Sequence, residues 1–204
     1  MRHQKKRWFA ALLSLCMLLS ILPSTSIAFS ESEETWSGNR RNQTIDGGTH
    51  TITLSNLTID SPGVEKSAID ITGNADVTFI LEGNNTLRGY RNHPAIWVES
   101  GSSFTFEGNG LLEASAGGAS IGLGAAGIGG GYGASSNFGN ITINGGTIIA
   151  RGSGGGAGIG GGSWTTKQDM DGINAASDIV ISGGRVSARG QYNLSLIHIS
   201  EPTR

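Results

Sequence analysis

The sequence predicts an all-β protein, a right-handed parallel β-helix (β-solenoid) of about five coils in which the last coil is truncated. Two observations lead to this prediction. A short strand pattern, such as Ile-Thr-Leu at 52–54 or Ile-Thr-Ile at 141–143, recurs along the chain. The hexapeptide Ala-Gly-Ile-Gly-Gly-Gly occurs twice, at residues 126–131 and 157–162. A strand unit that repeats every few dozen residues is typical of proteins that stack one repeat on the next.

Each repeat begins with a strand that carries two apolar side chains two positions apart. A period of two places both side chains on one face of the strand, so we expect two inward columns. The first column is formed by Ile52, Phe79, Phe104, Ile141 and Ile179. The second column is formed by Leu54, Leu81, Phe106, Ile143 and Ile181. Two positions later comes a residue that tolerates a positive φ, at which we expect a corner. These corner residues are Asn56, Gly83, Gly108, Gly145 and Gly183.

Two further strands complete each repeat. The second strand is centred on Ile59, Leu87, Leu112, Ile148 and Val186. The third strand holds Ile69, Ile96, Ile128 and Ile159, each preceded by a small residue. The first-strand positions are 27, 25, 37 and 38 residues apart, so we expect the later repeats to carry surface loops. A helical fold is disfavoured, because each interior glycine costs a helix about 1 kcal/mol relative to alanine.

The N-terminal residues 1–28 are predicted to be a secretory signal peptide. They combine a basic start, an apolar run and small residues at 26 and 28, before the expected cleavage site. The apolar run of about 15 residues is shorter than the roughly 20 that a membrane-spanning helix needs, so we expect no membrane span after cleavage. Residues 29–46 are expected to be a polar lead-in, in which Trp36 covers the open end of the first coil. The repeats are expected to extend over residues 47–193.

Charge and cysteine content narrow the classes of partner. Removal of residues 1–28 leaves 10 basic and 16 acidic side chains, a net charge of −6, and removes Cys16, the only cysteine. An acidic chain without a cluster of Lys and Arg in its sequence is a poor candidate for binding nucleic acid or anionic lipid. We therefore expect a secreted or cell-surface protein that is stabilised by stacking rather than by disulfides.

The segment 141–148, Ile-Thr-Ile-Asn-Gly-Gly-Thr-Ile, together with the second hexapeptide, resembles the repeats of large exported bacterial surface proteins that contain carbohydrate-binding domains. The resemblance covers about residues 52–189 and implies a role at the cell surface. A related β-helix family binds acidic plant polysaccharides and calcium through Asp-rich corners. This chain is similar to that pattern at one place, where Asp169 and Asp171 are candidate calcium ligands; no other cofactor is expected.

The last eleven residues, Leu-Ser-Leu-Ile-His-Ile-Ser-Glu-Pro-Thr-Arg at 194–204, break the repeat pattern. This string resembles a translated sequencing adapter, which implies that residues 194–204 are not native and that sequence beyond the repeats is missing. The start of the string has enough β-propensity to pair with the last coil as a makeshift strand.

Aromatic side chains are the strongest candidates for ligand binding. Sugar rings stack on exposed Trp and Tyr faces, and four such residues fall outside the predicted core columns. They are Tyr132, Trp164, Trp97 and Tyr90. Tyr132 and Trp164 follow the two hexapeptides at nearly the same offset. The first interpretation is therefore a non-catalytic module that binds polysaccharide or cell-wall glycan, or mediates adhesion.

Two alternatives remain open at this point. One is a structural stalk of a larger surface protein. The other is a polysaccharide lyase or hydrolase, although the acidic residues are scattered and the sequence places no acidic partner near His93. Arg151 and Arg189 fall at equivalent points of two repeats, which indicates a repeated surface position rather than a unique catalytic base.

Overall fold

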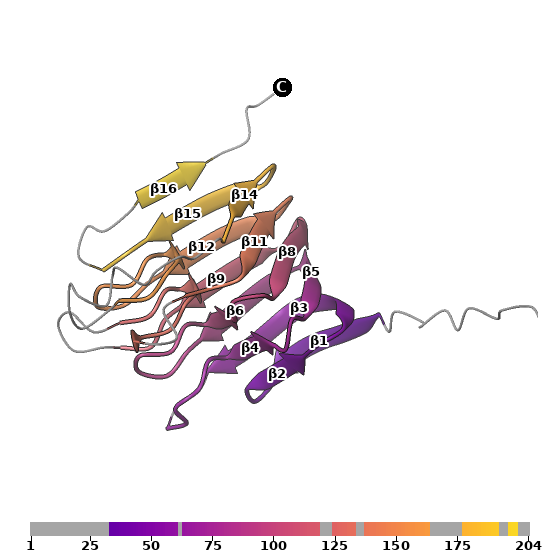
Figure 1. Ribbon diagram of the computed structural model, residues 1–204. Coiled ribbons are helices and arrows are strands. Elements are labelled where there is room, and N and C mark those ends of the chain that lie inside the picture. The colour runs from indigo at the N-terminus through magenta and orange to yellow at the C-terminus, as the bar shows by residue number, and fades with distance from the viewer. Residues whose placement is uncertain are drawn as a thin grey trace, which may run out of the picture. The chain divides into compact units, whose positions relative to one another are not determined.

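The computed structural model describes residues 33–60, 63–118, 124–133, 137–163, 177–191 and 196–199. All of them belong to the unit Glu31–Arg204. This part of the chain is all-β, with almost no helix, and its strands stack in the order of the sequence (Figure 1), which confirms the predicted class. Within the same residues, no helix is long and apolar enough to cross a membrane.

Three parallel ladders contain most of the described strands, and each repeat adds one strand to each ladder. The first ladder consists of β3 (Thr49–Asp60), β5 (Asp76–Glu82), β8 (Ser103–Gly108), β11 (Asn140–Ile143) and β14 (Ile179–Ile181). The second continues from the end of β3 into β6 (Asn84–Arg88), β9 (Leu111–Ser115), β12 (Thr147–Arg151) and β15 (Arg185–Arg189). The third consists of β2 (Gln43–Asp46), β4 (Ile69–Thr72), β7 (Ile96–Val98), β10 (Ile128–Gly129) and β13 (Ile159–Gly160).

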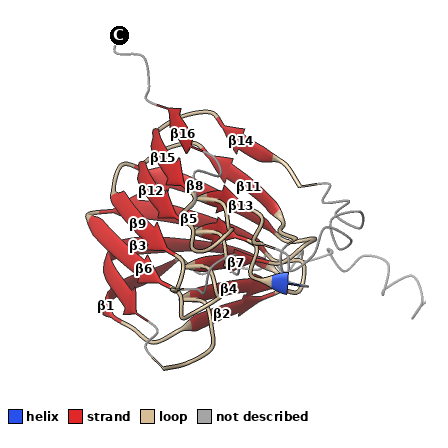
Figure 2. Cartoon of the chain, turned by 90° about the vertical axis from the view of Figure 1, so that its left-hand side faces the viewer, coloured by secondary structure: helices blue, strands red, loops and turns tan. Residues whose placement is uncertain are grey.

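The long strand β3 joins the first two ladders into one sheet. Its first half pairs with β5 and its last three residues pair with β6, so the sheet bends where β3 passes from one ladder to the other. The third ladder forms a separate five-stranded sheet. Figure 2 gives the view turned by 90°, in which the strands of both sheets lie in successive layers.

The predicted inward face is confirmed, but the predicted columns are wrong at one step. Phe79 pairs with Phe106, and Phe104 pairs instead with Val77. The strand β5 presents three alternate apolar residues to the core, so a shift of two residues keeps every side chain on the same face. The second ladder has the same shift, because Leu87 pairs with Ala114 rather than with Leu112. The remaining first-ladder pairs, including Phe104 with Ile141 and Ile141 with Ile179, lie as predicted.

The corners are also confirmed in part. Asn56, Gly83 and Gly108 have positive φ angles of 52°, 58° and 87°. In the two longer repeats the positive φ falls at Gly146 (78°) and Gly184 (77°), one residue after the predicted Gly145 and Gly183. Each of these corners contains two consecutive glycines, and either of them could adopt the left-handed conformation.

The third ladder stacks as predicted. Ile69, Ile96, Ile128 and Ile159 are register partners and lie in the core. The two hexapeptides therefore lie directly on one another, and their backbones are joined by hydrogen bonds such as Gly130 N–H to Gly160 C=O, at 2.8 Å. A Cβ at Gly129, whose φ is 123°, would overlap the Gly160 carbonyl oxygen, so the spacing of these repeats requires glycine.

The strands begin before Gly47, which differs from the expected lead-in. β1 (Glu34–Asn39) pairs in parallel with β3 and places Trp36 beside Leu54. Trp36 is only 4% exposed, and its ring centroid lies 6.1 Å from that of Phe79. This tryptophan therefore covers the first-ladder core, as expected, but it does so from an ordered strand because β3 supplies the backbone partners.

The strand β16 (Leu196–Ile199) lies along β15 and pairs with it antiparallel. All other strand pairs among the described residues are parallel. The expected pairing of this segment with the last repeat is thus observed, in an orientation that does not continue the ladders.

Candidate functional site

The outward face of the third ladder carries the beginning of a site. The side chains of Ile69 and Ile71 on β4, and of Ile96 and Val98 on β7, are buried, so the residues between them face away from the core. Those residues are Asp70 and Trp97, which are register partners. The next partner of Trp97 is Gly129, which has no side chain. Along the ladder, Trp97 therefore has an aspartate on one side and a glycine on the other.

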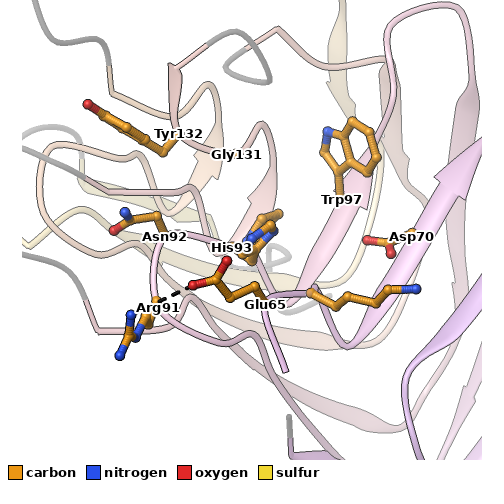
Figure 3. Close-up of a pocket in the computed structure, with 10 residues that line it drawn as sticks. Glu65, Asp70, Arg91, Asn92, His93, Trp97, Gly131 and Tyr132 are labelled. Atoms are coloured by element: carbon orange, nitrogen blue, oxygen red, sulfur yellow. Dashed lines mark ion pairs between the residues drawn. The ribbon is translucent and has the colours of Figure 1, made fainter. Parts of the chain in front are cut away.

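Two loops and the end of the first hexapeptide complete a pocket of about 450 Å³ around these residues. It is lined by Glu65, Lys66, Asp70, Arg91, Asn92, His93, Pro94, Trp97, Gly131 and Tyr132. Figure 3 shows Trp97 and Asp70 on neighbouring strands at one side, Tyr132 at the other, and His93 between them in this view. Residues from three successive repeats thus contribute to a single cavity.

The loop between β6 and β7 is held by its backbone. Tyr90 N–H donates to Lys66 C=O at 3.1 Å, and Gly117 N–H donates to His93 C=O at 3.0 Å, so the repeats on both sides hold the loop. Within the loop, His93 N–H donates to Tyr90 C=O at 3.0 Å. The pocket wall therefore has fixed backbone positions before any ligand arrives, which lowers the entropy cost of binding.

The charges of the pocket are nearly balanced. Glu65 and Arg91 form an ion pair at 3.7 Å, with side chains 73% and 66% exposed, and an exposed pair of this kind contributes little stability. The remaining charged groups are Lys66 and Asp70, with His93 close by. The pocket thus offers both hydrogen-bond donors and acceptors without a large net charge.

Burial raises the pKa of Asp70 above its ordinary value of 3.8. The Ser67 hydroxyl and the charges of Lys66 and His93 act in the opposite direction. The Ser67 oxygen makes no hydrogen bond of standard geometry with the described residues, which agrees with desolvation being the stronger effect. Asp70 is therefore a half-buried carboxyl group that would gain from a hydrogen-bond donor on a ligand.

The indole N–H of Trp97 is also unsatisfied. Its Nε1 atom is buried and has no hydrogen-bond partner in the described part of the chain. A buried donor without an acceptor costs free energy, and a ligand or water that supplied an oxygen would recover it. Trp97 thus combines an apolar ring at the pocket wall with a donor that lacks a partner.

Two of the four predicted aromatic residues, Trp97 and Tyr132, come together in this pocket. Tyr90 is not among the lining residues, and its ring lies against the Arg91 guanidinium at 5.3 Å. Trp164 and the candidate calcium ligands Asp169 and Asp171 lie outside the described residues. No group of three His, Cys, Asp or Glu side chains that could hold a metal ion is found among the residues that the structure covers.

The polar residues of the pocket were not predicted from the sequence. His93 and Asp70 line one cavity, so the structure gives His93 an acidic neighbour that the sequence alone did not place near it. The sequence did contain a signal that Asp70 lies beside Trp97. The two residues are 27 positions apart, which is the spacing of the first two repeats. The positions of the loop residues Asn92 and His93 depend on loop geometry, which the repeat pattern does not specify.

No family model matches this chain, and neither a curated protein nor a solved structure is significantly similar to it.

Proposed function

We propose that the protein is an exported, non-catalytic carbohydrate-binding module, built on a right-handed parallel β-helix and located at the cell surface or secreted. The pocket beside Trp97 is the proposed glycan site. The observation that carries this proposal is the meeting of Trp97 and Tyr132, from two repeats, in one pocket with polar side chains. The right-handed sense follows from the strong preference of parallel strand crossovers for that hand.

The chemistry of the pocket suits a sugar ring. A pyranose has an apolar C–H face and a rim of hydroxyl groups, so it needs an aromatic surface together with donors and acceptors at the edge. Trp97 and Tyr132 provide aromatic surface, while Asp70, Asn92 and His93 provide polar partners. A cavity of about 450 Å³ lies within the usual range for small-ligand sites.

The absence of catalysis in this proposal rests on the arrangement of the carboxylates. Glycoside hydrolysis commonly needs two carboxyl groups that face the same glycosidic bond. Of the two in this pocket, Glu65 is exposed and paired with Arg91, which leaves Asp70 without a second free carboxylate among the lining residues. Binding therefore accounts for the pocket more simply than bond cleavage does.

A panel of immobilised neutral polysaccharides tests this proposal. We expect the wild-type chain to bind at least one glycan, and Trp97→Ala and Tyr132→Ala each to weaken that binding by about tenfold or more, equal to about 1.4 kcal/mol. Trp97→Phe should retain part of the affinity, because it keeps one stacking ring but loses the five-membered ring and the indole N–H. The control is Thr105→Ala, on the outward side of β8 in the other sheet, which should bind like the wild type.

Thermal unfolding of each variant separates lost binding from lost folding. Glycan binding that both alanine variants leave unchanged would rule out this pocket. Absence of binding across the whole panel would favour the structural stalk, and depletion of the polymer with time would favour a lyase or hydrolase.

A further inference from the structure

A second surface feature lies on the outward face of the second ladder, where β3, β6, β9, β12 and β15 end. Successive register partners at this position are Asp60, Arg88, Ser115, Arg151 and Arg189. We propose that this arginine column binds an acidic polysaccharide, a polymer that carries a carboxylate on each sugar. The inference does not rest on the pocket beside Trp97.

The backbone fixes the spacing of the column. Arg88, Ser115 and Arg151 are each followed by a small residue, whose N–H donates to the carbonyl of the column residue in the next repeat. These bonds are Gly89 to Ser115 (3.0 Å), Ala116 to Arg151 (2.9 Å) and Gly152 to Arg189 (2.9 Å). Parallel strands lie about 4.8 Å apart, so Arg151 and Arg189 start one strand apart and Arg88 lies about 10 Å from Arg151.

Within the described part of the chain, the column arginines have no carboxylate at ion-pair distance. Arg88, Arg151 and Arg189 are exposed, and none of them forms an ion pair with another described residue. Asp60 heads the column, and Glu113 lies two positions before Ser115 on the same strand face, but neither carboxylate reaches an arginine within ion-pair distance. Like charges at adjacent strand positions repel each other. An anion lying across Arg151 and Arg189 would replace this repulsion with attraction.

The charge pattern also indicates the kind of anion. Arginine pairs with carboxylates through two parallel hydrogen bonds. Arg151 and Arg189 lie one strand apart and Arg88 lies two strands from Arg151, so a polymer with regularly repeated carboxylates suits their spacing. Double-stranded nucleic acid carries one charge per about 1.7 Å, and binding it usually needs a broad basic surface. Here the basic groups form one narrow column on a chain whose net charge is −2.

Affinity electrophoresis with polygalacturonate tests the inference on the full chain. The double variant Arg151→Gln/Arg189→Gln should bind at least about tenfold more weakly than the wild type, because it loses two charge-assisted contacts. The matched control is Arg185→Gln, which removes an exposed arginine from the same strand, β15, outside the column. We expect this control to change affinity by less than about twofold.

The methyl-esterified polymer provides the second control, because it has the same backbone without the charges and should not bind. Trp97→Ala should keep its affinity for polygalacturonate. The inference would be overturned by equal binding of the esterified polymer, by unchanged binding of the double variant, or by loss of binding in Trp97→Ala. Tighter binding of single-stranded DNA through the same arginines would overturn the assigned class of ligand.

Discussion

At the scale of single residues, glycine is needed where the backbone of one repeat passes close over the next. A Cβ at Gly162 would overlap the carbonyl of Gly131, in the equivalent position of the preceding hexapeptide. A Cβ at Gly118 would meet nothing within 4 Å. Gly162→Ala should therefore lower the free energy of unfolding by about 1–3 kcal/mol, as overpacking usually does, while Gly118→Ala should be nearly neutral. Urea unfolding of both variants checks this, and equal stabilities would show that the hexapeptide backbones are not in close contact.

The pKa of Asp70 makes a second prediction at this scale. Because that pKa is raised in the folded state, the folded chain holds a proton at pH values where the unfolded chain has released it. The stabilisation is complete below the ordinary pKa of 3.8 and is lost as the pH rises through the folded pKa. Asp70→Asn should remove this pH dependence. Compared with the wild type, its free energy of unfolding should therefore be more favourable near neutral pH than in acid.

Urea unfolding of the wild type and Asp70→Asn from about pH 3.5 to 7 measures the effect. The control is Glu107→Gln, a neutral substitution of an exposed carboxylate on β8. If the free energies of unfolding of the wild type and Asp70→Asn change in parallel over this pH range, the pKa of Asp70 is not raised in the folded state.

At the scale of the element, the sequence identifies strands and faces better than it identifies register. Alternating apolar residues predict the inward side of β5, but Val77, Phe79 and Leu81 all lie on that side and each could have paired with Phe104. The structure keeps a constant separation of 27 residues, from Ile52 to Phe79 and from Phe79 to Phe106. The predicted pairing of Phe79 with Phe104 gives a separation of 25 residues instead of 27. Equal spacing of these two repeats would therefore have predicted the register correctly.

The pairing of the last strand leads to a prediction for the element β16. It adds to β15 in the antiparallel sense, whereas the repeats pair in parallel, so it does not continue any ladder. If residues 194–204 are foreign to the repeats, their deletion should shift the thermal midpoint by no more than about 2 °C, the low end of the shift expected for 1 kcal/mol in a chain of this size. Differential scanning calorimetry of the shortened and full chains makes the comparison. A much lower midpoint after deletion would identify β16 as a genuine cap and would contradict the resemblance to an adapter.

At the scale of the whole molecule, the repeat pattern predicts which side chains are buried and, in part, which are gathered at a site. Trp97 and Tyr132 were predicted from their type and from their places outside the core columns, and the structure places both in one pocket. The repeat pattern could not predict that the loop after β6 brings Asn92 and His93 to them, because its path depends on long-range bonds to Lys66 and Gly117. It placed Arg151 and Arg189 of the arginine column at equivalent points of two repeats, as the structure does. It missed Arg88, because the predicted pairing of Leu87 with Leu112 was two residues out of register.

The central claim is that a glycan binds against Trp97. The fluorescence emission of this residue tests the claim most directly. The chain has four tryptophans, and Trp8→Phe, Trp36→Phe and Trp164→Phe together leave Trp97 as the only one. Calorimetry first confirms that this variant still unfolds cooperatively and binds the best glycan of the polysaccharide panel. Titration with that glycan should then change the Trp97 emission saturably, with the same Kd as calorimetry, and Tyr132→Ala in this background should raise the Kd by about tenfold. Calorimetric binding with unchanged Trp97 emission would contradict the claim, because the glycan would then occupy another part of the molecule.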